Sequence, residues 1–104
     1  ISLWKREILE SIDGVNVTGI GYGAFFGNKT ITDITIPATV TTIIETAFNN
    51  VEIKTYTFKG NVPERFNAIR PWPQSFTIRY PKNASGWADF KLVSDYYKPI
   101  MEAY

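Results

Sequence analysis

The chain has 104 residues, of which 44% are apolar and 15% aromatic, and its formal net charge is +1. This length supports one modest domain with its own core. Because basic residues form no run, the charge pattern excludes the surface expected of a nucleic-acid-binding protein. No apolar stretch is long enough to cross a bilayer, so we expect no membrane insertion.

The sequence contains no Cys and no His. It therefore lacks thiol nucleophiles, disulfides, His-based catalytic triads and the usual zinc ligands. The ten carboxylates include no calcium-loop motif and no acid/base pair set by a recognisable motif. We therefore expect a protein that is not an enzyme and that holds no cofactor or metal.

The N-terminal segment, residues 1–16, carries apolar residues at Leu3, Trp4, Leu9 and Ile12. These residues fit either a capping helix or an edge strand. The repeat period described below favours a strand near Leu9–Ile12.

Residues 17–25 begin the first clear unit. Val17-Thr-Gly-Ile20 predicts a short strand, and Ala24-Phe25 predicts a single helical or 3₁₀ turn whose Phe fills the interior. The intervening Gly19-Ile-Gly-Tyr-Gly23 lacks the Lys and the long helix of a nucleotide loop. It therefore predicts a tight turn.

Two strands are predicted at 31–36 and 53–58, because apolar residues alternate there with polar ones. Ile-x-x-Ile-x-Ile in the first is matched by Ile-x-x-Tyr-x-Phe at the same positions of the second. Pro37 ends the first strand, because proline cannot donate a ladder hydrogen bond. Between them, Val40-Thr-Thr-Ile43 and Ala47-Phe48 repeat the short strand and the turn of the preceding unit.

Weaker copies extend the period in both directions, at 9–14 and at 75–80. A regular centre with atypical ends is typical of a stacked repeat, in which each unit buries its apolar face against its neighbours. One full turn of chain per unit would place equivalent strands side by side and parallel. We expect an inward ladder of Ile12, Ile34, Tyr56 and Ile78.

The C-terminal part begins with a proline-rich crossing at 61–81. Within it, Arg70-Pro-Trp-Pro73 predicts a stiff extended segment that brings Trp72 onto the end of the coil. Beyond it, apolar residues recur at helical spacing at Trp87, Phe90, Val93 and Tyr97. They predict an amphipathic helix that covers the last repeat and ends before Pro99.

The central residues resemble a known family. The string Val17-Thr-Gly-Ile-Gly-Tyr-Gly-Ala-Phe-Phe-Gly-Asn28, then Ile-Thr-Asp-Ile-Thr-Ile-Pro at 31–37, is similar to the BspA-type leucine-rich repeat. That family is marked by Val-x-x-Ile-Gly, Ala-Phe and a strand that ends in Ile-Pro. The chain departs from the pattern at Ile44, where the family usually has Gly, and at Ser75 in place of an apolar residue. The resemblance implies a bacterial surface or secreted protein associated with adhesion to host proteins or other cells.

These observations predict an α/β repeat: a short leucine-rich-repeat solenoid with a C-terminal helical cap and with parallel strands spaced by about 22 residues. Residues 1–104 form one domain, with a partial repeat or cap at 1–16, the two best repeats at 17–60, and a degenerate repeat and cap at 61–104. We expect this domain to be a fragment of a longer protein, extracellular or at the cell surface.

The candidate binding residues are the outward-facing positions of the strands, because the sheet face is a common binding surface in leucine-rich repeat proteins. The alternative is that Thr occupies these positions only because it has a high strand propensity, with no role in binding. The candidates are Thr32, Asp33, Thr35, Lys54, Thr55, Thr57, Thr77 and Arg79.

The expected function is a non-catalytic binding or adhesion module whose partner is a host or matrix protein, or a cell-surface glycan. A structural spacer or C-terminal cap of a larger repeat array, with no ligand of its own, is one alternative. Separately, an exposed coil end would allow the domain to self-associate. A carbohydrate-binding accessory domain is another alternative, since aromatic residues of the C-terminal part could form a sugar-stacking platform. These residues are Trp72, Tyr80, Trp87, Tyr96, Tyr97 and Tyr104, of which Tyr96 and Tyr104 are expected to be exposed. Trp87 is expected to belong to the cap instead, and Trp72 also fits that interpretation.

Overall fold

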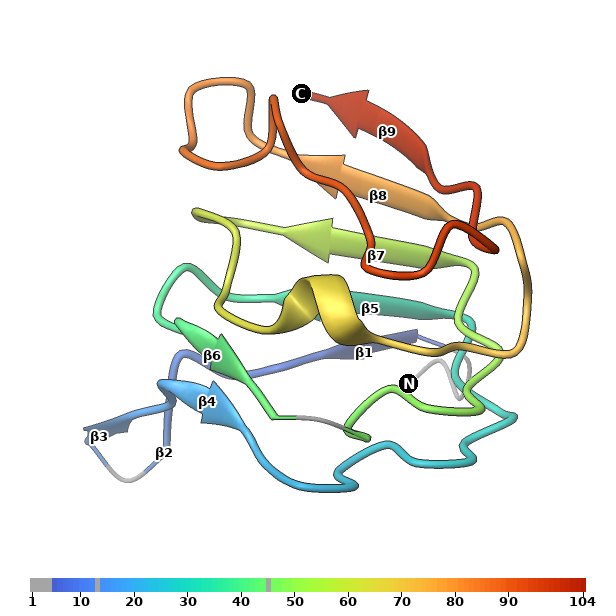
Figure 1. The fold of residues 1–104 in the computed structure, drawn as a ribbon. Helices are drawn as coiled ribbons and strands as arrows, with labels where there is room; N and C mark the ends of the chain where they lie inside the picture. Colours follow the sequence, from blue (N-terminus) through green and yellow to red (C-terminus); the bar gives the residue numbers. More distant parts are fainter. Residues whose placement is uncertain (1–4, 13, 45) are drawn as a thin grey trace.

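A computed structural model describes residues 5–12, 14–44 and 46–104, and in it the chain winds into a coil (Figure 1). Successive turns contribute parallel strands to one five-stranded sheet of order β1-β5-β7-β8-β9. The strands are β1 (Lys5–Glu7), β5 (Asp33–Ile36), β7 (Thr55–Phe58), β8 (Thr77–Tyr80) and β9 (Ile100–Ala103). The predicted repeat solenoid with parallel strands is confirmed.

The register of the sheet follows the repeat. Ile34 lies opposite Tyr56, which lies opposite Ile78, so equivalent positions are about 22 residues apart. The last step, from Ile78 to Met101, is slightly longer. Ile34, Tyr56 and Ile78 are buried while their neighbours along the strands are partly exposed, so the predicted alternation holds because strand side chains have a period of two.

The predicted ladder is wrong at its first position. β1 pairs with β5 through Arg6, which lies opposite Ile34, so the first step along the chain is longer than the later ones. The additional residues form an antiparallel hairpin of β2 (Ser11–Ile12) and β3 (Val15–Asn16). Gly14 has a positive φ, a backbone conformation that favours glycine in this turn. Ile12 therefore pairs within the hairpin and not in the main sheet.

A second line of short pairings closes the coil behind the sheet. β4 (Gly19–Ile20) pairs in parallel with β6 (Thr42–Ile43), as the Val-x-x-Ile pattern predicts. Thr42 forms a further parallel bridge to Glu64. The Ala-Phe segments form single turns, and in the third unit the turn becomes the 3₁₀ helix η1 (Phe66–Ala68).

The predicted C-terminal helical cap is wrong. Residues 81–99, all described, contain no helix and lead into the fifth strand, β9. Their backbone bonds run to the preceding coil: Val93 N–H donates to the Asn67 carbonyl at 2.9 Å and Lys98 N–H to the Gln74 carbonyl at 2.9 Å. The helically spaced residues do not share a face, because Trp87 is 2% exposed and Val93 68% exposed.

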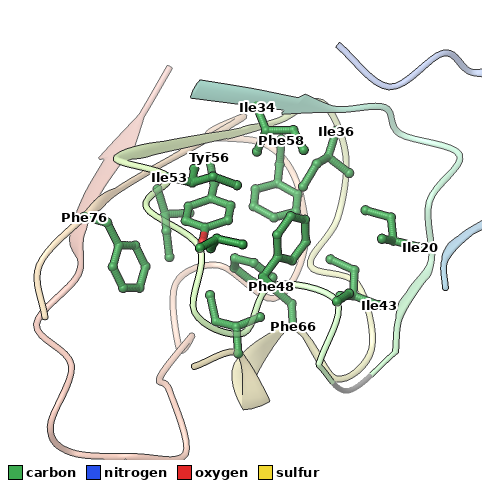
Figure 2. Packing of buried hydrophobic residues seen from close by; sticks show 14 of the residues in the cluster. Ile20, Ile34, Ile36, Ile43, Phe48, Ile53, Tyr56, Phe58, Phe66 and Phe76 are labelled. Atoms are coloured by element: carbon green, nitrogen blue, oxygen red, sulfur yellow. The ribbon is translucent and has the colours of Figure 1, made fainter. Parts of the chain in front are cut away.

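The core lies between the sheet and the second line of turns (Figure 2). Aromatic side chains pack edge to face within it. The ring centroid of Tyr56 lies 5.4 Å from that of Phe48 and 5.6 Å from that of Phe66. Phe48 comes from the predicted Ala-Phe turn and is fully buried. The turn thus places an aromatic side chain in the interior, as its sequence predicts.

The Tyr56 hydroxyl is buried in this apolar core without a hydrogen-bond partner among the described residues. Burial, with a smaller contribution from Tyr97, raises the pKa of Tyr56 well above its ordinary value. An unpaired buried hydroxyl costs about 1–3 kcal/mol. We expect Tyr56→Phe to raise the free energy of unfolding by about 1 kcal/mol, measured by urea denaturation.

Tyr104→Phe is the contrasting variant, because the Tyr104 hydroxyl donates to the Phe58 carbonyl. Its loss should lower the free energy of unfolding by about 1 kcal/mol. A destabilised Tyr56→Phe protein would contradict the assignment of an unpaired hydroxyl.

Candidate binding face

The outer face of the sheet is built from two ladders of side chains that point away from the core. One ladder runs through Asp33, Thr55, Thr77 and Ile100. The other runs through Glu7, Thr35, Thr57, Arg79 and Glu102. We call these nine residues the sheet face. Because opposed Thr side chains on one face contact each other, Thr35–Thr57 and Thr55–Thr77 also support the strand pairing.

Ion pairs lie near both edges of the sheet face. Lys59 Nζ, just beyond β7, lies 3.2 Å from Glu7 Oε2 on β1. Arg79 Nε lies 2.8 Å from Glu102 Oε1, and its guanidinium carbon lies 5.1 Å from the centre of the Tyr104 ring. These side chains are largely exposed, so each pair contributes roughly 0–1 kcal/mol to stability. Their main effect is to arrange both signs of charge around a central area of threonines.

The structure brings six of the eight predicted residues together on strands β5, β7 and β8: Asp33, Thr35, Thr55, Thr57, Thr77 and Arg79. Thr32 and Lys54 precede their strands, and the Thr32 carbonyl accepts from the N–H groups of Lys54 and Thr55. Lys54 is exposed beside the sheet face. Whether any of these residues binds a partner stays a prediction.

Sequence reasoning missed the contribution of β9. Ile100 and Glu102 extend the two ladders by one strand, but the expected helix left the residues after Pro99 unassigned. The repeat period could have indicated this strand, because one further repeat length after Ile78 reaches the residues next to Met101. The sheet face is therefore one strand wider than the sequence predicts.

Trp87, Tyr96 and Tyr104 have the burial that the sequence predicts, whereas Trp72 does not. Trp87 is buried, and its indole Nε1 donates to the Gly60 carbonyl at 3.0 Å. Tyr96 and Tyr104 are exposed. Trp72 is 65% exposed, so the expectation that it packs onto the end of the coil is wrong.

The sheet face offers hydroxyls, charges of both signs and one apolar edge residue, which suits recognition of a polar macromolecular surface. Among the described residues, no group of His, Cys, Asp or Glu side chains could hold a metal ion. The same part of the chain contains no helix long and apolar enough to cross a membrane.

Parallel strands at a near-constant step, closed by short turns around one continuous core, define a leucine-rich-repeat solenoid. A family model described as a BspA type leucine rich repeat region (6 copies) matches residues 5–69. The chain belongs to the BspA-type leucine-rich repeat family. No curated protein and no solved structure matches the chain significantly.

The family match covers β1 through η1, whereas β8 and β9 lie beyond it. Solenoids of this kind are typically protein-interaction scaffolds without enzymatic activity. The family is generally found in bacterial surface or secreted proteins.

Proposed function

We propose that the chain is an adhesion module that binds a folded host or matrix protein through its sheet face, as part of a secreted or surface-attached bacterial protein. The observation that carries the proposal is the alignment of nine outward side chains in two ladders across five strands. A solenoid holds such ladders on a rigid backbone, so binding would require little ordering of the protein. The family's role in protein interaction supports the same conclusion.

The charge pattern defines the kind of partner. Asp33, Arg79 and Glu102 on the face, with Lys54 beside it, carry charges of both signs around threonine hydroxyls. This mixture suits a protein surface of no extreme charge, because complementary pairs at an interface set orientation and specificity.

The test combines three substitutions, Asp33→Ala, Lys54→Ala and Arg79→Ala. The probe is a set of purified extracellular-matrix proteins, including laminin, fibronectin and collagen, measured by surface plasmon resonance. We expect the native chain to bind at least one of them and the triple variant to lose about tenfold or more in affinity. Its free energy of unfolding should change by no more than about 1 kcal/mol, because the removed charges are at the surface.

A charge-matched control replaces Asp89, Lys82 and Lys91 by Ala, since all three are exposed and lie outside the sheet face. This control should bind as the native chain does. Equal loss in both variants would contradict a site on the sheet face. A folded native chain that binds none of the matrix proteins would favour the structural-spacer alternative.

A further inference from the structure

A hollow of about 520 Å³ lies beside the proline-flanked Trp72, and none of its lining residues belongs to a strand of the sheet. Its walls include Trp72, Tyr96, Asn50, Gln74 and Arg70. Small-ligand sites are concave and combine aromatic side chains with a few polar groups, and this open hollow has walls of both kinds. The hollow is thus a second candidate site, separate from the sheet face.

A smaller hollow of about 270 Å³ shares Arg70 as a wall. It is lined by further polar side chains, which include Thr46, Asn49, Asn67 and Ser94. We call the two hollows together the Trp72 groove. The aromatic hollow and the polar hollow therefore meet at Arg70.

The aromatic end is held rigidly. The backbone N–H of Trp72 donates to the Val51 carbonyl at 2.8 Å. The Tyr97 hydroxyl donates to the Pro71 carbonyl at 2.9 Å. Gln74 Nε2 donates to the Tyr96 carbonyl at 2.8 Å, which ties the two walls together. Prolines on both sides of Trp72 restrict its backbone further. A ligand would therefore meet a segment whose backbone is already fixed.

One side of the Trp72 ring is supported by a cation. Lys29 Nζ lies 4.8 Å from the ring centre, and Lys29 does not line the groove. Trp72 as a residue is 65% exposed. Its other face is therefore available to a ligand, and the electron-rich face of an indole attracts the C–H bonds of a sugar ring.

The polar end presents the exposed side chains of Arg70 and Asn67. No described carboxylate pairs with Arg70, which leaves its planar donors free to bind oxygen atoms. A ligand with many hydroxyls suits these groups, because each hydroxyl can accept from the guanidinium or donate to an amide oxygen.

We propose that the Trp72 groove binds an oligosaccharide, with one pyranose ring stacked on Trp72 and the next unit hydrogen-bonded to Arg70 and the amides. A proline-rich peptide is the competing ligand, because aromatic grooves also bind such peptides. Proline has no N–H, so a polyproline segment cannot donate a backbone hydrogen bond to the exposed amide groups of Asn67 and Gln74. The groove chemistry thus favours the sugar.

The experiment titrates the full chain with soluble oligosaccharides, measured by calorimetry and Trp fluorescence. The probes are cellohexaose, maltohexaose, chitohexaose and an oligogalacturonate. We expect saturable binding of at least one probe and a loss of about tenfold or more in Trp72→Ala. The matched control is Tyr22→Ala, which removes an 80% exposed aromatic side chain outside the groove and should bind normally.

Arg70→Ala is the second groove variant and should also weaken binding about tenfold, most strongly for the oligogalacturonate if that probe binds. The sheet-face triple variant keeps the groove intact and should bind sugar as the native chain does. The proposal is overturned if no probe saturates up to about 10 mM, which corresponds to negligible affinity. It is also overturned if Trp72→Ala binds normally, or if decaproline binds through Trp72 and the sugars do not.

Discussion

Trp87→Ala is expected to lower the free energy of unfolding by about 3–5 kcal/mol, the largest effect that we predict for one substitution. Trp87 is 2% exposed and lies between the last two coils. Its ring stacks on Tyr80 at 5.5 Å and tilts against Phe58 at 4.7 Å. Small domains are stable by only about 5–15 kcal/mol, so this loss would remove much of the total.

Urea denaturation followed by circular dichroism measures this effect. Trp72→Ala is the matched control, and it should change stability by no more than about 0.5 kcal/mol because the side chain is exposed. Trp87→Phe should recover part of the loss, since it keeps aromatic packing but not the bond to the Gly60 carbonyl. A loss below about 1 kcal/mol in Trp87→Ala would contradict its role in joining the coils.

Gly60→Ala is expected to destabilise the chain by about 1–3 kcal/mol. A Cβ at this position would lie 2.8 Å from Ala38 Cα and 2.9 Å from Ala38 Cβ. Ala38 occupies the equivalent position one coil earlier, so the added methyl group would push two coils apart. The Gly60 carbonyl also accepts from Trp87, so the displacement would disturb a second contact.

Gly21→Ala is the control, because a Cβ there meets no atom within 4 Å. Thermal and urea unfolding should place this variant close to the native chain, within about 0.5 kcal/mol. If Gly60→Ala were as stable as Gly21→Ala, the close approach of the coils would not matter for stability.

The central repeat was predictable because its spacing reports a physical constraint. Ile34 and Tyr56 occupy equivalent positions because each coil must return an apolar side chain to the same place in the core. The Ala-Phe turn was predictable for the same reason, since Phe48 fills the interior. The register of the first strand was not predictable. The β2–β3 hairpin adds residues between β1 and β5, so the first repeat is longer than the period of the later ones.

Part of the candidate site was also predictable. Alternation alone assigns Thr55 and Thr57 to the outer face, because strand side chains have a period of two. It could not add Ile100 and Glu102, which depend on the fifth strand. Nor could it find the Trp72 groove, whose walls come from separate segments that only the coil brings together.

The sequence by itself determined the repeat, the alternation of inward and outward side chains and the absence of Cys and His chemistry. These properties depend on local spacing and composition. Only the tertiary structure decided that residues 81–99 form another coil and not a helix, and that Trp72 faces solvent. The physical reason is that the N–H groups of Val93, Lys98 and Ile100 bond to carbonyls of the preceding coil, partners that local spacing does not specify.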